Sequence, residues 1–220
     1  MIRLPDPVAA VVFDMDGTLL DTELLYRSAM HDACRDMGVA MSSELHLSLI
    51  GTPPDAGSRL LRAAFGEGFD VEAFGHRVHE GLEAASVDGV PLKPGALDIL
   101  TFLKARGVPT GLATSTVREV ALPRLERAGL LSLLDVVVTR TDVVHGKPHP
   151  ESYLLAAQRL GVDPACCIAV EDSHTGVRAG VAAGMATLMV PDLLAPTDEI
   201  AALCTAVISS LHDLKAALAG

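Results

Sequence analysis

Residues 10–23 of this 220-residue chain read AVVFDMDGTLLDTE, and this stretch decides the fold. An apolar run that ends at Phe13 leads directly into Asp14 and Asp16, and Gly17 follows them. A continuous apolar run is typical of a strand that is covered on both faces. Two carboxylates one residue apart repel each other. The stretch therefore predicts a buried strand whose end carries a charged site.

Six apolar runs alternate with helical patterns along the chain. The runs are PVAAVVF (7–13), VPTGLAT (108–114), LDVVVT (134–139), CCIAV (166–170), ATLMV (186–190) and TAVIS (205–209). The helical segments lie roughly at 95–106, 116–128, 151–160 and 174–183, and a glycine follows each one where a C-cap would fall. This alternation predicts an α/β fold with a doubly wound parallel sheet, similar to a Rossmann fold.

The alternation is interrupted by a block without strand runs. Four helices are expected in it, near 22–37, 43–49, 55–65 and 71–86. We therefore predict a core domain formed by residues 1–19 and 90–220, with residues 20–89 as an inserted helical subdomain.

Composition and charge exclude several classes of protein. The formal net charge is −11, opposite in sign to that of a general nucleic-acid binder. No apolar stretch reaches the ~20 residues that a membrane helix needs, and the N-terminus shows no export signal. The four cysteines have no CxxC spacing and are expected to be reduced thiols. We expect a cytoplasmic monomer or weak homodimer that binds neither nucleic acid nor membrane.

Polar clusters follow four of the six runs. They read DMDGT, TST, RTDVVHGKP and EDSHTG, in chain order. Because ligands of open parallel sheets bind at the carboxyl ends of the strands, these clusters are expected to converge on one site.

The residue types in these clusters indicate phosphoryl chemistry. Asp14, Asp16, Glu171 and Asp172 concentrate negative charge that a cation would make tolerable, and an all-oxygen donor set favours Mg²⁺. The hydroxyls of Thr114 and Ser115 and the ammonium of Lys147 suit a phosphoryl group. No serine or cysteine lies in a recognisable triad, so an aspartate is the expected nucleophile.

The four clusters together resemble the motifs of the haloacid dehalogenase (HAD) superfamily of aspartyl-phosphate enzymes. The resemblance rests on DMDGT, the threonine of LATS, Lys147 in HGKPHPE and the acidic pair of VEDSHTG, and it covers essentially the whole chain. The position of the 20–89 block is similar to that of the helical cap in the β-phosphoglucomutase-like branch.

The resemblance implies a role for each motif residue. Asp14 attacks phosphorus and becomes the aspartyl phosphate, while Asp16 protonates the leaving alcohol and then activates water. The phosphoryl group is held by Thr114, Ser115 and Lys147. Asp14, the backbone carbonyl of Asp16, and Asp172 bind Mg²⁺, and Glu171 is either a ligand or a partner of the ligands. Two residues of the cap are the expected substrate contacts. They are Tyr26, in the first cap helix, and Thr52, in the GTPP loop (51–54).

Departures from family patterns favour a phosphatase that hydrolyses a small phosphomonoester, such as a sugar phosphate, phosphoglycolate or a nucleotide-like ester. Mutases of the β-phosphoglucomutase type carry a histidine where Tyr26 stands and an arginine in the cap loop, yet a mutase remains an alternative. Dehalogenases have the nucleophilic aspartate but no second acid at the position of Asp16, so the presence of Asp16 argues against a dehalogenase.

Alternatives from other classes are a receiver-like signalling domain and a family member that only binds a phospho-ligand. A receiver places its phosphorylated aspartate after the third strand rather than the first. His76 and His79 have the spacing of a metal pair without an evident third ligand, so a solvated helix face is expected there.

Overall fold

The computed structural model describes residues 2–50, 52, 54–86 and 89–219, and these form two compact units. The first, called the core unit here, comprises Met1–Asp21 and Val90–Gly220. The second, called the helical unit, is Thr22–Gly89. Each unit is described by itself.

The core unit is built on a six-stranded parallel sheet with the strand order β3-β2-β1-β4-β5-β6. The strands are β1 (Ala10–Phe13), β2 (Thr110–Ala113), β3 (Val136–Val138), β4 (Cys167–Glu171), β5 (Ala186–Met189) and β6 (Ala206–Val207). Each predicted apolar run contains one strand, and β4 extends one residue beyond its run. The predicted fold class, a doubly wound parallel sheet, is confirmed.

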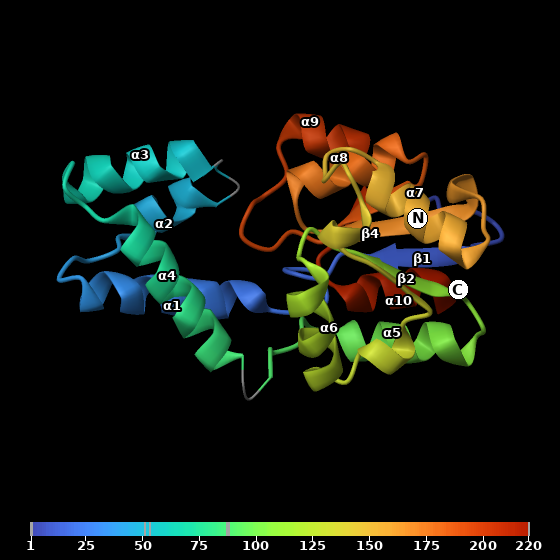
Figure 1. The fold of residues 1–220 in the computed structure, drawn as a ribbon. Coiled ribbons are helices and arrows are strands. Elements are labelled where there is room, and N and C mark those ends of the chain that lie inside the picture. Colours follow the sequence, from blue (N-terminus) through green and yellow to red (C-terminus); the bar gives the residue numbers. More distant parts are fainter. Residues whose placement is uncertain (1, 51, 53, 87–88, 220) are drawn as a thin grey trace. The chain divides into compact units, whose positions relative to one another are not determined.

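Helices cover both faces of this sheet (Figure 1). The predicted ones are α5 (Ala96–Ala105), α6 (Arg118–Arg127), α7 (Glu151–Leu160) and α8 (His174–Ala182). In Figure 1, α7 and α8 lie on one side of the strands and α5 lies on the other with α10 (Leu211–Ala219). Sequence reasoning missed α10, α9 (Asp198–Leu203) and three short 3₁₀ helices, η1 (Leu131–Leu133), η2 (Arg140–Asp142) and η3 (Pro164–Cys166).

Small side chains let α8 lie close to the sheet. A Cβ added to Gly180 would lie 2.8 Å from Thr187 Oγ1 and 2.9 Å from Ala169 Cβ, so the position has no room for a larger residue. Ala179, the preceding residue, lies in the same buried cluster as Ala169. Close packing of this kind fixes the direction in which the helix leaves β4 and hence the position of the loop between them.

The strand order reverses between β1 and β4. From β1 the chain moves outward through β2 and β3, and it then returns to form β4 on the other side of β1. In open α/β sheets the ligand site lies at the carboxyl ends of the strands beside this reversal. Phe13 pairs in register with Leu112 of β2 and Val170 of β4, so the residues after these strands emerge side by side.

The helical unit contains α1 (Thr22–Asp36), α2 (Ser43–Leu49), α3 (Pro54–Phe65) and α4 (Val71–Ala85). These bounds differ by no more than one residue from the predicted segments. Ser42 and Asp70 cap α2 and α4 by accepting hydrogen bonds from Leu45 N at 3.1 Å and Ala73 N at 2.9 Å. The unit has its own buried core, which includes Ala29, Met30, Ala33, Cys34, Leu61, Phe74 and Val78.

The two segments that lead to the helical unit are tied together within the core unit. Asp21 N donates to Pro91 O at 2.8 Å, and Lys93 N donates to Leu19 O at 3.0 Å. None of the helices in the described part of the chain has the length and apolar character that a bilayer-spanning helix needs.

Candidate active site

The ends of β1 and β4 bring three acidic residues together. Asp14 N donates to Val170 O at 2.9 Å, which places Asp14 beside Glu171, the last residue of β4. Asp14, Glu171 and Asp172 each offer a carboxylate oxygen, and these oxygens lie within 4.8 Å of one another. Asp14 and Glu171 are buried and Asp172 is half-buried. The predicted convergence of the first and fourth motifs is thus present.

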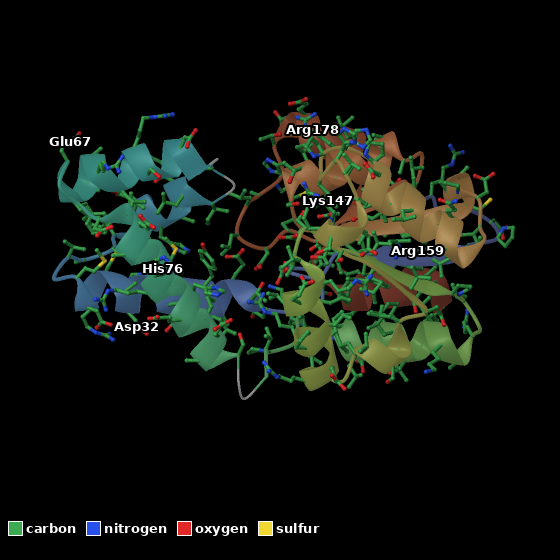
Figure 2. All side chains as sticks on the ribbon, viewed as in Figure 1. Asp32, Glu67, His76, Lys147, Arg159 and Arg178 are labelled. Carbon is green, nitrogen blue, oxygen red and sulfur yellow. The ribbon has the colours of Figure 1, made fainter. Side chains whose placement is uncertain are left out.

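Lys147 supplies the positive charge at this point. It lies in the loop between η2 and α7 and is labelled in Figure 2. Its ammonium donates to Asp14 Oδ1 at 2.6 Å and to Glu171 Oε1 at 2.5 Å, and only 5% of its side chain is exposed. The lysine therefore bridges the two buried carboxylates.

Glu171 is held by several donors besides Lys147. The hydroxyl of Tyr153 donates to its Oε1 at 2.8 Å, and the hydroxyl of Ser173 donates to its Oε2 at 3.1 Å. A Cβ added to Gly176, in the first turn of α8, would overlap the Glu171 carboxylate. Because both of its oxygens already accept hydrogen bonds, Glu171 is suited to fixing Lys147 in place.

Asp172 approaches the backbone of the first motif. Thr18 donates to its Oδ1 at 3.4 Å. Gly17 has φ of +83°, and a Cβ added there would collide with the Asp172 carboxylate. Only glycine combines this left-handed conformation with such a close approach at low cost. The glycine of DMDGT therefore lets the fourth motif reach the first.

The cluster is short of positive charge. Burial raises the pKa of Asp14 to about 8, although Lys147 opposes this, and burial also raises the pKa of Asp172 well above its ordinary range. Burial alone lowers the pKa of Lys147, but Asp14 and Glu171 together raise it above its usual value. Three carboxylates thus share one cation. A divalent ion would offset the remaining charge, and an all-oxygen donor set fits Mg²⁺ rather than zinc.

Asp16 is held apart from that cluster. Thr116 donates to its Oδ2 at 2.6 Å, and Arg124 of α6 donates to its Oδ1 at 3.4 Å. Its side chain is 27% exposed, in contrast to that of Asp14. The two aspartates of DMD therefore point their carboxylates to different partners, and Asp16 is left able to exchange a proton with solvent or substrate.

The second motif occupies the end of β2. Thr114 is buried, and its hydroxyl accepts a hydrogen bond from Thr116 N at 3.0 Å. Ser115 is exposed at the same strand end. Both hydroxyls belong to the turn that connects β2 with α6, where a phosphate oxygen is commonly bound.

Comparison with known proteins shows the family of the chain. The sequence profile of haloacid dehalogenase-like hydrolases matches residues 8–184. The chain belongs to this family.

Relatives of this HAD hydrolase include named phosphatases. It is 39% identical over 176 residues to a phosphorylated carbohydrates phosphatase of Thermotoga maritima, across 80% of this chain and 82% of the relative. It is 36% identical over 179 residues to hexitol phosphatase A of Escherichia coli, across 81% of each chain. A crystal structure of a HAD family hydrolase from Deinococcus radiodurans with bound phosphate and sodium matches with a TM-score of 0.83 at 32% identity, over 97% of this chain and 96% of that one.

These findings confirm the predicted enzyme class, a HAD-type phosphomonoester hydrolase. They also exclude the receiver-like signalling domain, because the family match begins before β1 and the DxD motif follows that strand. The roles of the individual site residues stay predictions.

Two residues outside the predicted clusters contact the site of this HAD hydrolase. They are Tyr153 on Glu171 and Arg124 on Asp16, whereas Thr116, which donates to Asp16, lies in the TST cluster but was given no role. Tyr153 carries a weak signal, since it is one of two tyrosines in the chain and lies three residues after the end of the GKPHP loop. Arg124 carries none, because its distance from Asp16 depends on how α6 packs.

The helical unit contains a cavity of about 520 Å³. Both predicted substrate contacts of the cap, Tyr26 and Thr52, line it, whereas Gly51 and Pro53 of the GTPP loop lie outside the described residues. His46 lines it too, is only 4% exposed, and has no hydrogen-bond partner for either ring nitrogen among the described residues. Burial lowers the pKa of His46, which favours the neutral form of its ring. The cavity thus has a largely apolar wall, and both ring nitrogens of His46 are buried within it.

The solvated helix face expected at His76 and His79 is present. Both residues are exposed on α4, and His79 Nε2 lies 3.4 Å from Glu83 Oε1 one turn further on. Within the described part of the chain, no metal-capable cluster includes either histidine.

Proposed function

We propose that this HAD hydrolase removes phosphate from small phosphorylated carbohydrates through an aspartyl phosphate on Asp14. The observation that carries the proposal is the buried bridge from Lys147 to Asp14 and Glu171 at the reversal of strand order. A lysine that fixes one carboxylate oxygen leaves the other free to approach an electrophile. Neighbouring hydroxyls and cations then stabilise the charge on the transferring group.

In the first step, a carboxylate oxygen of Asp14 attacks phosphorus and the ester oxygen leaves. Asp16 donates its proton to that oxygen, which departs as the alcohol. In the second step, Asp16 takes a proton from water, and the resulting hydroxide attacks the phosphorus of the aspartyl phosphate. Inorganic phosphate leaves and Asp14 is regenerated. The half-exposed position of Asp16, held by Thr116 and Arg124, supports its use as the acid and base.

In this proposal the second motif, with Thr114 and Ser115, and the third motif, with Lys147, bind the phosphoryl group. Thr114 and Ser115 donate hydroxyl hydrogen bonds to its oxygens, and Lys147 supplies a positive charge. Mg²⁺ would be held by Asp14, the backbone carbonyl of Asp16, and Asp172, where it offsets the charge of the phosphoryl group. Glu171 positions Lys147 rather than coordinating the ion, because its oxygens are already used by Lys147, Tyr153 and Ser173.

Substrate recognition is assigned to the helical unit, Thr22–Gly89, acting as the cap. Tyr26 and Thr52 line its cavity and offer hydroxyl groups beside an apolar wall, and His46 lies in the same wall. Sugars and sugar alcohols present hydroxyls on a carbon frame, and two relatives are named for phosphorylated carbohydrates and hexitol phosphates. The four free cysteines are compatible with the cytoplasmic location expected from the sequence.

Release of inorganic phosphate tests this function. The wild-type chain is assayed with p-nitrophenyl phosphate and with a panel of hexose phosphates, hexitol phosphates, phosphoglycolate and nucleoside monophosphates. We expect Mg²⁺-dependent phosphate release, with the highest kcat/KM on a hexose or hexitol phosphate. Turnover that survives EDTA would contradict the proposed metal. Interconversion of hexose phosphate isomers without net phosphate release would establish the mutase instead.

A further inference from the structure

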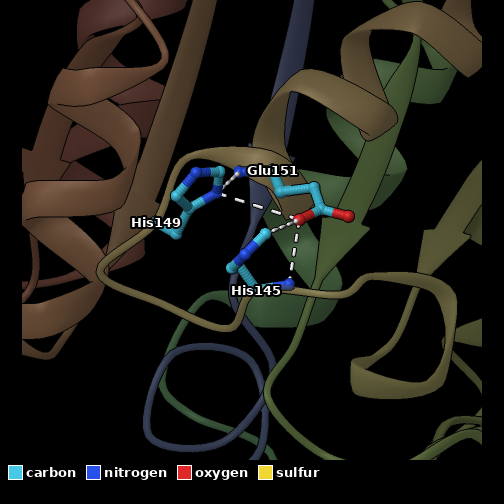
Figure 3. Close-up of side chains that lie close together, drawn as sticks. All are labelled: His145, His149 and Glu151. Carbon is cyan, nitrogen blue, oxygen red and sulfur yellow. Dashed lines mark hydrogen bonds and ion pairs between the residues drawn. The ribbon is translucent and has the colours of Figure 1, made fainter.

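A second group of metal-capable side chains lies on the loop that carries Lys147. His145, His149 and Glu151 each offer a ligand atom within 4.8 Å of the others, and Figure 3 shows the two rings beside one carboxylate. His145 Nδ1 lies 3.0 Å from Glu151 Oε2, and His149 Nδ1 lies 3.9 Å from the same oxygen. The histidine side chains are 63% and 51% exposed, and that of Glu151 is 29% exposed. The group, called the histidine triad here, is therefore open to solvent.

The carboxylate of the triad is already fixed in place. Val144 N donates to Glu151 Oε1 at 2.8 Å, and His145 N donates to Oε2 at 2.9 Å. These backbone hydrogen bonds lower the pKa of Glu151 to about 2. Glu151 is also the first residue of α7, so its backbone is anchored as well. A fixed, ionised carboxylate needs little reorganisation to accept a cation.

The spacing of the donor atoms suits a small tetrahedral ion. With Zn–N and Zn–O bonds of about 2.0–2.2 Å, two ligands of a tetrahedral zinc lie roughly 3.4 Å apart. The two nitrogen–oxygen distances at Glu151, 3.0 and 3.9 Å, lie on either side of that value. The ion would take the place of the hydrogen bond between His145 Nδ1 and Glu151 Oε2, and the neutral ring of His145 would then carry its one N–H proton on Nε2. Because the triad is open to solvent, water could occupy the fourth coordination position of the ion.

Both rings of the triad also have a hydrogen-bond partner on Glu151. His145 Nδ1 lies 3.0 Å from Glu151 Oε2, and the backbone N–H of Glu151 donates to His149 Nδ1 at 3.3 Å. These contacts hold both rings beside one carboxylate. The two imidazole rings lie with centroids 4.6 Å apart and a tilt of 36°. Two imidazoles held this close can bind one metal ion.

We propose that His145, His149 and Glu151 form a surface site for Zn²⁺, separate from the buried carboxylate cluster. The two sites differ in chemistry. Two imidazoles and one carboxylate favour a borderline transition metal, whereas the all-oxygen cluster favours Mg²⁺. Bound Zn²⁺ links both flanks of Lys147, since His145 precedes it by two residues and His149 follows it by two. The bound ion would therefore connect the two sides of the loop that carries Lys147.

Metal titration of the full-length wild-type chain tests the site. Excess Mg²⁺ is present throughout to occupy the buried carboxylates. We expect one Zn²⁺ per chain with a Kd on the order of 1–10 μM, measured against a chromophoric chelator. Co²⁺ serves as the spectroscopic probe, because a histidine–carboxylate site lacks the thiolate charge-transfer band that a cysteine site would give.

Variants separate the triad from other histidines. His145→Ala and His149→Ala are each expected to weaken Zn²⁺ binding at least tenfold, since even the loss of an outer hydrogen-bond partner costs about 10- to 100-fold at metal sites. The matched control is His76→Ala combined with His79→Ala, the exposed pair on α4, which should leave the Kd unchanged. Asp14→Asn should also leave it unchanged, so failure of the proposed catalytic mechanism would not affect this result.

Thermal stability gives an independent readout. At about 100 times its Kd, Zn²⁺ should raise the Tm of the wild type by roughly 5 °C or more. The variant with both His145→Ala and His149→Ala should show no such shift. Absence of Zn²⁺ binding at millimolar concentration, equal Kd values for wild type and the triad variants, or a thiolate band with Co²⁺ would each overturn the proposal.

Discussion

The carboxylate cluster of the core unit and the cavity of the helical unit differ in whether their buried polar side chains have hydrogen-bond partners. In the cluster, Glu171 has three side-chain donors, and Lys147 lies on two carboxylates. In the cavity, His46 is as well buried but has no hydrogen-bond partner among the described residues. A site whose groups satisfy one another is built before the substrate arrives. In the cavity, by contrast, both buried ring nitrogens of His46 are left without a partner among the described residues. This difference suggests that the core unit supplies the chemistry and the helical unit the choice of substrate.

Replacing the proposed nucleophile, Asp14, should abolish catalysis and leave substrate recognition unchanged. Asp14→Asn keeps the shape of the side chain but loses the attacking charge, so kcat should fall about 10³-fold or more. The variant should be no less stable than the wild type, because one buried carboxylate of the cluster becomes neutral. Steady-state phosphate release and thermal denaturation measure both effects. Asp36→Asn, at the exposed end of α1, is the matched control. Activity close to wild type in Asp14→Asn would rule out the assigned nucleophile.

Removing the metal should have nearly as large an effect. EDTA is expected to reduce phosphate release to background, and added Mg²⁺ should restore it. Mg²⁺ should also raise the Tm of the wild type by a few °C, because it binds the folded cluster only. Asp172→Asn should lose most of that shift. A Tm that does not respond to Mg²⁺ in the wild type would mean that the cluster does not bind the ion.

Replacing the proposed acid should depend on the leaving group. Asp16→Asn removes a proton donor, which is worth about 10²-fold or more for an alcohol that leaves poorly. With p-nitrophenyl phosphate the leaving group needs no proton, so the loss in the first step should be much smaller. Burst kinetics on the two substrates compare the first step directly. An equal loss of rate on both would argue against Asp16 as the general acid.

Changing the cavity should alter recognition and leave the chemistry intact. His46→Leu removes the unpaired imidazole, so KM for the preferred sugar phosphate should rise about tenfold, the loss of roughly one hydrogen bond. The kcat on p-nitrophenyl phosphate should not change, and stability should hold or increase. His79→Leu on the exposed face of α4 is the control. If KM stays constant and stability falls, His46 is a structural residue.

An acidic residue outside both regions should affect stability alone. Asp142, in η2, accepts hydrogen bonds from Thr139, Arg118 and Arg159, the last labelled in Figure 2. Although burial works against it, these bonds hold the pKa of Asp142 well below its ordinary 3.8. Its contribution is therefore present above about pH 4 and is lost as the pH falls further.

Asp142→Asn should accordingly lower the free energy of unfolding by about 1–3 kcal/mol at pH 7. The difference from wild type should shrink below about pH 4, and kcat should change little. Urea denaturation across that pH range measures it. A difference that is independent of pH would show that the carboxylate charge is not what stabilises the loop.

The sequence predicted well those features that depend on neighbouring residues. The six runs became strands because each is apolar enough to be buried on both faces. Asp14, Thr114 and Glu171 could be placed because the end of a strand fixes its position in a parallel sheet. Of the missed helices, α9 spans only six residues, which is too short to show a helical period.

Features that depend on packing could not be predicted. Arg124 reaches Asp16 across 108 residues, and Tyr153 reaches Glu171 only because α7 packs on the sheet. In SELHLSL nothing distinguishes His46 from a solvated histidine, since its burial arises from the packing of the helical unit. For the same reason, the substrate follows less directly from the sequence than the reaction does.

Trapping the covalent intermediate tests the central claim most directly. The wild-type enzyme is quenched during turnover of p-nitrophenyl phosphate with Mg²⁺, treated with borohydride, digested and analysed by mass spectrometry. Borohydride reduces an acyl phosphate to the alcohol, so an aspartyl phosphate becomes homoserine. We predict homoserine at position 14 and nowhere else, with none when substrate is omitted. Full turnover with an unmodified Asp14, or homoserine at Asp16 or Asp172, would contradict the account.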